Sequence, residues 1–264
     1  MRRITMMVAV LWAACWAGQV AAADPIRIGL VDETTGPQAE AGVLTLRGAQ
    51  LALSEINAAG GILGRQVQLV IEDNQSTNPG TVLAYSKLVD QKVVAVIGPL
   101  RSTQVQAASP TIAKAKLPAI IGGSDPSLTR VNNPWIFRVR PNDFYSSRVV
   151  AEFGTKDLGK KKWAIIHSTD TFGANGKIAL TAALKSLGIE PVLTQGFTSN
   201  QQDFTAVVLS LKKSGADIVG SYIANSPDVG ILARQLRQLG VKVEWIGSTS
   251  LATETALKLA GDAL

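Results

Sequence analysis

The chain has 264 residues, of which 46% are hydrophobic, so it can bury a sizeable core and is not a disordered or low-complexity polypeptide. Its formal net charge is +6, and the basic residues are concentrated only at Lys160–Lys162. Without aromatic residues interleaved among these lysines, a nucleic-acid partner is not expected.

The first 23 residues are typical of a secretory signal peptide. Arg2 and Arg3 precede an apolar run that is short for a membrane span, and Ala21 and Ala23 supply the small residues of a cleavage site. We expect export to the periplasm with cleavage after Ala23. A lipoprotein signal with Cys15 as the lipidated residue is the alternative. Because Cys15 is the single cysteine, no disulfide and no Cys-ligated metal are expected in the mature chain.

Downstream of the leader, β-branched runs alternate with helical patterns. The first series predicts strands over 26–31, 67–73, 93–98 and 117–122, and helices over 41–59, from 79 onward, and over 103–116. The second series predicts strands over 162–167, 191–197, 216–222 and 243–247, with helices beginning near 146, 172, 203 and 227.

Two successive series of this kind predict an α/β protein with two doubly wound, parallel-sheet lobes. We expect the N-terminal lobe to cover residues 24–141 and the C-terminal lobe residues 142–264. An eight-stranded barrel is the structural rival. The apolar run 135–139, with no crossover helix before it, favours a crossing between two lobes instead.

Ligands bind beyond the carboxyl ends of the strands in open parallel sheets. The loops that follow the predicted strands are therefore expected to surround one cleft between the lobes. These loops are 34–37, 99–103, 122–126, 168–173, 223–227 and 248–250.

Known catalytic and cofactor motifs are missing from the sequence. Gly29 lies inside the first predicted strand with the wrong spacing for a dinucleotide fingerprint, and no phosphate-binding Gly-x-x-x-x-Gly-Lys-Ser/Thr motif occurs. The single histidine, His167, ends a predicted strand near Asp170 and can face the cleft, but no Gly-x-Ser-x-Gly turn presents a nucleophile to it. We therefore expect no cofactor, no metal and no enzymatic activity.

Polar residues after two neighbouring strands suit a bound carboxylate. Thr103 and Gln106 have the spacing of a capping box at the start of a helix, and Ser102 adds a hydroxyl donor just before it. Gly122 to Ser124 lie beyond the next strand, where glycine lets backbone N–H groups approach a ligand closely. The alternative is that Ser102 and Thr103 only cap the helix.

An ordered series of motifs resembles one known family. The motifs are "IRIGLVDETTGPQAEAG", "RGAQLALSEINAAGGILGRQVQLVIEDNQS", "VVAVIGPLRSTQVQAASP", "LPAIIGGSDPSLT", "DTFG" and "DFTAVVLSLKKSGADIV". Together they resemble the periplasmic Leu/Ile/Val-binding protein family, the solute receptors of branched-chain amino acid ABC importers. The resemblance covers essentially all of residues 24–264.

The resemblance implies a type I periplasmic binding protein that closes on a small organic ligand and delivers it to the membrane permease of an ABC importer. Within it, Ser102, Gly122 and Ser124 would hold the ligand carboxylate, with Thr103 beside them. Phe172 stands where an aromatic residue covers the ligand. Nothing in the sequence indicates an oligomer, so a monomer is expected.

Three positions depart from relatives that bind aliphatic amino acids. Thr249 stands where those relatives have an acidic partner for the α-ammonium, Asn225 where they often have tyrosine, and Ala41 where they often have an aromatic residue. A buried ammonium without a carboxylate partner is costly. An aromatic or aliphatic acid, or an amide, therefore fits at least as well as a branched-chain amino acid. Arg101 is expected to be exposed rather than to bind the ligand.

Two alternatives to a transport receptor are a sensory ligand-binding domain of the same fold and an enzyme on a doubly wound fold. The chain stops at "LKLAGDAL", before the crossing by which the resembled family completes its first lobe. If the chain is truncated, the first lobe is expected to expose apolar surface and the protein to have low stability.

Overall fold

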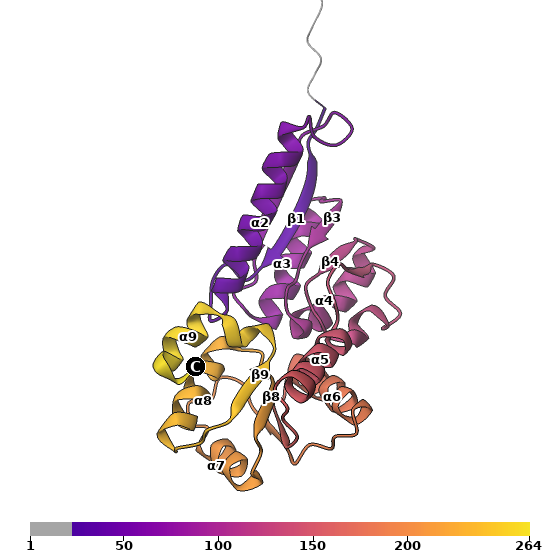
Figure 1. The fold of residues 1–264 in the computed structure, drawn as a ribbon. Coiled ribbons are helices and arrows are strands. Elements are labelled where there is room, and N and C mark those ends of the chain that lie inside the picture. The colour runs from indigo at the N-terminus through magenta and orange to yellow at the C-terminus, as the bar shows by residue number, and fades with distance from the viewer. Residues whose placement is uncertain (1–22) are drawn as a thin grey trace, which may run out of the picture.

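The computed structural model describes residues 23–264, which form two lobes, each with its own parallel sheet (Figure 1). Residues 1–22, with Cys15 and most of the expected signal peptide, lie outside the described residues. The prediction of two doubly wound parallel-sheet lobes is confirmed, because the strands form two separate sheets and not one barrel.

The first lobe contains a five-stranded sheet in the order β2-β1-β3-β4-β5, with every neighbouring pair parallel. Its strands are β1 (Ile26–Asp32), β2 (Val67–Asp73), β3 (Ala95–Ile97), β4 (Ala119–Ile121) and β5 (Ile136–Arg138). Its helices are α2 (Ala39–Ala58), α3 (Asn78–Asp90), α4 (Ser102–Ala115) and the 3-10 turn η1 (Pro126–Thr129).

The second lobe contains a four-stranded parallel sheet in the order β7-β6-β8-β9. Its strands are β6 (Trp163–Ser168), β7 (Leu193–Phe197), β8 (Ile218–Tyr222) and β9 (Glu244–Gly247). Its helices are α5 (Asp143–Glu152), the π-helical η2 (Phe153–Asp157), α6 (Thr171–Ser186), α7 (Thr205–Ser214), α8 (Ser226–Gln238), η3 (Thr249–Ala252), α9 (Glu254–Ala260) and η4 (Gly261–Ala263).

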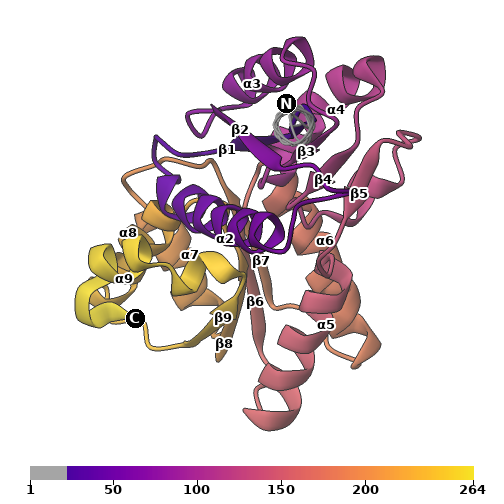
Figure 2. The same ribbon diagram turned by 90° about the horizontal axis from the view of Figure 1, so that it is seen from above.

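The chain passes between the lobes after β5. The apolar run 135–139, which favoured a crossing between two lobes, contains β5 at the edge of the first sheet, paired in parallel with β4. A parallel strand can follow its neighbour without an α-helix between them when a long loop brings the chain back to the starting edge of the sheet. Between β4 and β5 this loop contains the 3-10 turn η1. The crossing segment is therefore 139–142, after which α5 packs beside α6 (Figure 2).

The cores of the two lobes are built separately. In the first lobe, Tyr85, Leu88 and Ile112 of α3 and α4 are fully buried against the sheet. In the second, Trp163 and Tyr222 belong to a buried cluster that includes residues of α5 and α6. Buried side chains of this size fix each lobe as a rigid unit, so the residues between the lobes are positioned by two independent cores.

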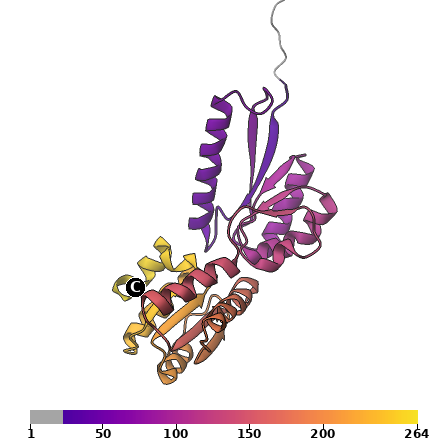
Figure 3. The same ribbon diagram turned by 45° about the vertical axis from the view of Figure 1, so that its right-hand side comes forward.

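Helix α2 lies on one side of the first sheet, and α3 and α4 lie on the other (Figure 3). On the α2 side several large apolar residues are exposed, including Leu51 at 62% and Val139 at 82%. The second lobe also exposes large apolar residues, such as Tyr145 at 68% and Val149 at 66%, so an apolar surface that results from truncation of the first lobe stays a prediction.

Candidate ligand-binding site

A cavity of about 430 Å³ lies between the carboxyl ends of the two sheets. Loops of both lobes line it, as expected for ligand sites of open parallel sheets. All seven residues named from the sequence are among its lining residues: Ser102, Thr103, Gly122, Ser124, Phe172, Asn225 and Thr249. The volume is in the range of pockets that enclose small molecules.

The first turn of α4 faces this cavity. The predicted capping box of Thr103 and Gln106 is wrong: the helix begins at Ser102, extended Arg101 is its N-cap, and no side chain caps the turn. Gln106 instead accepts a hydrogen bond from Thr171 of the second lobe. Within the described residues, no side chain caps the N–H groups of this turn, so these groups remain available to an anion.

The hydroxyl of Ser102 is oriented by the protein as a donor. Its Oγ accepts a hydrogen bond from the backbone N–H of Asp125 at 3.2 Å. Since a hydroxyl has one proton and two lone pairs, accepting this bond leaves the proton of Ser102 free to be donated. Ser102 lines the cavity, so this proton and the N–H groups of the first turn form one donor surface.

The loop after β4 does not offer the ligand the backbone N–H of Gly122 that was expected from the sequence. The N–H of Gly122 donates to the carbonyl of Pro99 at 3.0 Å and is not available to a ligand. A Cβ at Gly122 would lie 2.5 Å from Leu100 Cδ1 and 3.0 Å from Leu100 Cα, so the position packs tightly against the segment before α4 and favours glycine. Ser124 donates its own proton to Asp143 Oδ2 at 3.0 Å and therefore offers lone pairs to the cavity.

Arg101 lines the cavity but is not a free cation. Its Nε donates to Glu33 Oε1 at 2.8 Å, and Glu33 has a side chain that is 0% exposed. Gln104 donates to the other oxygen of Glu33 at 3.1 Å. The expectation of an exposed Arg101 is wrong, because its partner Glu33 is 68 residues away along the chain and local sequence does not indicate the contact. Nη1 of Arg101 also reaches the carbonyl of Ala224 in the second lobe at 3.0 Å.

The wall contributed by the second lobe is aromatic and polar. Phe172, at the start of α6, packs on Tyr222 with ring centroids 5.6 Å apart. The hydroxyl of Tyr222 is hydrogen-bonded to Ser146 and Ser147 of α5. Asn225 donates to Asn200 at 2.8 Å, and Thr249 opens η3 on the same wall. This wall offers an aromatic surface with neutral polar groups and the carboxylate of Asp170 around it.

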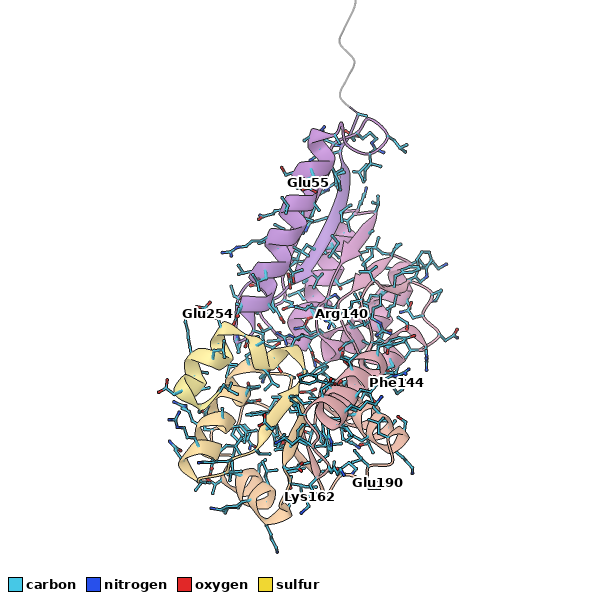
Figure 4. All side chains as sticks on the ribbon, viewed as in Figure 1. Glu55, Arg140, Phe144, Lys162, Glu190 and Glu254 are labelled. Carbon is cyan, nitrogen blue, oxygen red and sulfur yellow. The ribbon has the colours of Figure 1, made fainter. Side chains whose placement is uncertain are left out.

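Polar residues of the cavity that the sequence analysis did not single out include Gln38, Arg140 and Asp143. Asp143 is 3% exposed, and its burial raises its pKa to about 6. Arg140, labelled at the junction of the lobes in Figure 4, is exposed and donates to the carbonyl of Gly122 at 3.2 Å. The sequence "RPND" (140–143), one residue after the end of β5, was a usable signal, because polar residues that follow a strand lie at the ligand-binding edge of the sheet.

Side chains of the first lobe reach the second lobe around the rim of the cavity. Besides Arg101, Asp125 accepts a hydrogen bond from Asn175 at 2.8 Å. Glu40 of α2 accepts hydrogen bonds from the N–H groups of Glu254 and Thr255 at 2.7 and 3.0 Å, and so caps α9. Glu254 is labelled in Figure 4 beside the lower end of α2. The two lobes are thus joined by polar contacts around the rim of the cavity.

His167, the residue considered for catalysis, does not line the cavity. His167 is buried, its Nδ1 lies 2.9 Å from the carbonyl of Ser168, and it is not a lining residue. The expectation that it can face the cleft is wrong, because the side chain lies against Gly196 of the neighbouring strand.

Among residues 23–264, no group of three His, Cys, Asp or Glu side chains could hold a metal ion. No helix of this part of the chain is long and apolar enough to cross a membrane.

Comparison with known proteins relates the whole described chain to one family. The sequence profile of the family described as "Periplasmic binding protein" matches residues 25–264. The chain is 34% identical over 237 residues to the "Amino acid binding protein" of Pseudomonas aeruginosa, which covers 89% of this chain and 63% of that protein.

Solved structures agree with this relationship. The branched-chain amino acid transporter substrate binding protein LivJ from Streptococcus pneumoniae, in complex with isoleucine, superposes with a TM-score of 0.81 at 26% identity and covers 90% of this chain and 68% of that one. A solute binding protein from R. palustris, in complex with 4-hydroxybenzoate, has a TM-score of 0.80 at 22% identity and covers 90% and 66%; at this identity it shows the fold alone. The chain spans about two thirds of the length of these relatives.

Proposed function

Because the chain belongs to the periplasmic binding protein family, we propose that it is the solute-binding component of an ABC importer of the branched-chain amino acid transport type. It binds a small carboxylate or amino-acid-like ligand in the cavity between its lobes. It then delivers the ligand to the membrane permease, acts in the periplasm as a monomer, and performs no chemistry on the ligand.

The observation that carries this proposal is the donor surface at the start of α4. The N–H groups of its first turn have no side-chain cap, and the Ser102 proton is free for donation, on the wall of a cavity between two sheets. A carboxylate accepts several such bonds and interacts favourably with the positive end of the helix dipole. Ser102 and Thr103 are the proposed carboxylate-binding residues.

The second lobe supports the same proposal. Phe172 and Tyr222 give an aromatic wall opposite α4, with Asn225 and Thr249 at its polar edge. Gly122 shapes the loop that brings Ser124 to the cavity. We propose that the lobes, with a boundary at residues 141 and 142, open and close around the ligand, because the contacts that join them across the rim are individual polar bonds.

Ser102→Ala tests the proposed carboxylate site. Hydrogen bonds to a charged group are worth about 1.5–3 kcal/mol, so the variant is expected to bind the best ligand of a carboxylate panel about 10-fold more weakly or worse. Isothermal titration calorimetry measures the affinity. Ser54→Ala, at an exposed position of α2 far along the helix from the cavity, is the matched control and should bind like the wild type. Equal affinity of both variants would contradict the assignment of Ser102.

A further inference from the structure

Two side chains of the first lobe converge on one short segment of the second lobe, residues 224 and 225. Arg101 Nη1 donates to the carbonyl of Ala224 at 3.0 Å, and Gln38 Nε2 donates to Oδ1 of Asn225. Both contacts lie where the chain enters α8, on the wall of the cavity. The conformation of this segment therefore affects how the second lobe meets the first.

Asn225 does not use its side chain as its position in α8 would suggest. It is the N-cap residue of the helix, where asparagine ordinarily accepts a hydrogen bond from the first turn, yet its side chain makes no capping bond. The residue is 4% exposed, and its Nδ2 donates to Asn200 Oδ1 at 2.8 Å while its Oδ1 accepts from Gln38. A residue that departs from its local role in this way is typical of a functional position.

Asp228, in the first turn of α8, holds the partner of Asn225. Both oxygens of its carboxylate accept from the backbone N–H of Asn200 at 3.1 Å. Asn200 has a φ of 68°, a left-handed conformation that is uncommon for residues other than glycine. The bond to Asp228 stabilises this conformation, from which the side chain of Asn200 reaches Asn225.

The charge of Asp228 sets the direction of the hydrogen bonds that follow. An ionised carboxylate only accepts hydrogen bonds, and the side chain of Asn225 lies close enough to lower its pKa. With Nδ2 of Asn225 on the side of Asp228 and Asn200, its oxygen is left for the donor of Gln38. Protonation of Asp228 would place a hydroxyl against these N–H groups and disturb the arrangement.

We propose that Asp228 is a positioning residue for ligand binding, which acts through Asn200 to orient the Asn225 amide so that its oxygen meets Gln38 of the first lobe. Asp228 is 1% exposed and is not among the residues that line the cavity, so it does not act on the ligand directly. This inference rests on the proposed function and adds to it a dependence on the charge of a residue outside the cavity.

A pH dependence of ligand affinity follows. Burial raises the pKa of Asp228 to about 6, and the charge of Asp170 contributes in the same direction. Among residues 23–264 no ion pair within 4.0 Å involves Asp228. Because the contact with Gln38 favours the ionised form, affinity should fall as the pH drops through this range. Asp143, on the cavity wall, has a pKa raised to about 6 as well, so the informative quantity is the difference between the wild type and an Asp228 variant.

A double-mutant cycle in ligand affinity tests this role. The ligand is the tightest binder that calorimetry finds at pH 7.5 among L-leucine, L-phenylalanine, 4-methylpentanoate and 4-hydroxybenzoate. Gln38→Met and Asp228→Asn should each weaken binding by about 5-fold. Since both act on one contact, the double variant should also bind about 5-fold more weakly, and not the roughly 25-fold of independent sites. Between pH 7.5 and pH 5.5 the wild type should lose about 3-fold more affinity than Asp228→Asn.

Two further variants complete the cycle. Asp203→Asn makes the same change at an exposed residue, keeps an acceptor for the N–H of Thr205, and should bind like the wild type. Asn200→Gly suits a φ of 68° and keeps the N–H that Asp228 accepts, but removes the oxygen that holds Asn225. It should show the same non-additivity with Gln38→Met, so the role of this contact is tested even if Asp228→Asn does not fold.

Three results would overturn this inference and leave the proposed function standing. The first is wild-type affinity of Asp228→Asn or of Gln38→Met. The second is full additivity of Gln38→Met with Asp228→Asn or with Asn200→Gly, which would mean that these residues only stabilise the second lobe. The third is a pair of parallel pH profiles for the wild type and Asp228→Asn. A wild type that binds none of the four ligands would contradict the proposed function, and this inference with it.

Discussion

Arg101 and Ser102 are neighbours in the sequence, yet they act on different parts of the molecule. The guanidinium of Arg101 is held by buried Glu33, so its charge is largely used within the protein. The hydroxyl of Ser102 is held as a donor by Asp125 and is available to the cavity. A pattern of residue types alone does not separate these roles, because each role is set by a partner far along the chain.

Asp32, at the end of β1, gives the protein a pH-dependent stability. It is 1% exposed, and its burial raises its pKa from 3.8 to about 7. The folded state therefore binds more protons than the unfolded state between about pH 4 and pH 7, and stability falls as the pH rises through this window. Burial raises the pKa of Asp143 and of Asp228 to about 6, which adds contributions of the same sign.

Asp32→Asn should remove the part of this dependence that belongs to Asp32. The asparagine keeps an oxygen for the N–H of Glu33, which Asp32 Oδ1 accepts at 2.9 Å. We expect the wild type to lose on the order of 2 kcal/mol more stability than the variant between pH 4.5 and pH 7.5. Urea unfolding at the two pH values measures the difference. Parallel pH profiles for the two proteins would show that Asp32 does not titrate in this range.

At the scale of elements, the alternation of β-branched runs and helical patterns was sufficient to predict the strands of both sheets to within a few residues. Those runs reflect strands covered on both faces, which local sequence records directly. β5 was harder to predict, because its three residues pair only through β4 and no helix precedes it. The start of α4 was shifted by one residue because extended Arg101, not a hydroxyl residue, takes the N-cap position.

The candidate site was predictable to a similar degree. Residues on loops after strands reached the cavity as expected, since the carboxyl ends of parallel strands lie together. Hydrogen-bond direction was not predictable, because it depends on tertiary partners. Ser102 and Ser124 look equivalent in the sequence, but one is a donor and the other an acceptor.

Glu40 connects two elements that lie in different lobes. Its carboxylate caps α9 from α2, a contact that opening of the lobes would break. Loss of a helix cap costs about 1 kcal/mol, so Glu40→Ala should weaken ligand binding by about 5-fold if closure accompanies binding. Calorimetry with the best ligand measures the effect. Glu55→Ala, on the exposed part of α2 labelled in Figure 4, is the control; a Glu40 variant that binds as tightly as this control would disprove the coupling.

The molecule as a whole consists of two cores joined by polar contacts and one crossing segment. Apolar residues on the α2 side of the first lobe, such as Leu44 and Leu51, are exposed. In a protein whose lobes have separate cores, a ligand bound in the cavity contributes much of the free energy that holds the two lobes together. Ligand binding should therefore have a large effect on its thermal stability.

Thermal unfolding with and without ligands is the most direct test that this protein binds a small carboxylate between its lobes. The panel consists of the amino acids, aliphatic and aromatic acids, and amides, each at millimolar concentration. A ligand with a micromolar dissociation constant should stabilise the folded state by about 4 kcal/mol and raise the Tm by about 10 °C. At least one carboxylate should produce such a shift, and the corresponding neutral analogue without a carboxylate should produce none. A Tm that no carboxylate raises by more than about 1 °C would show that the cavity does not bind carboxylates.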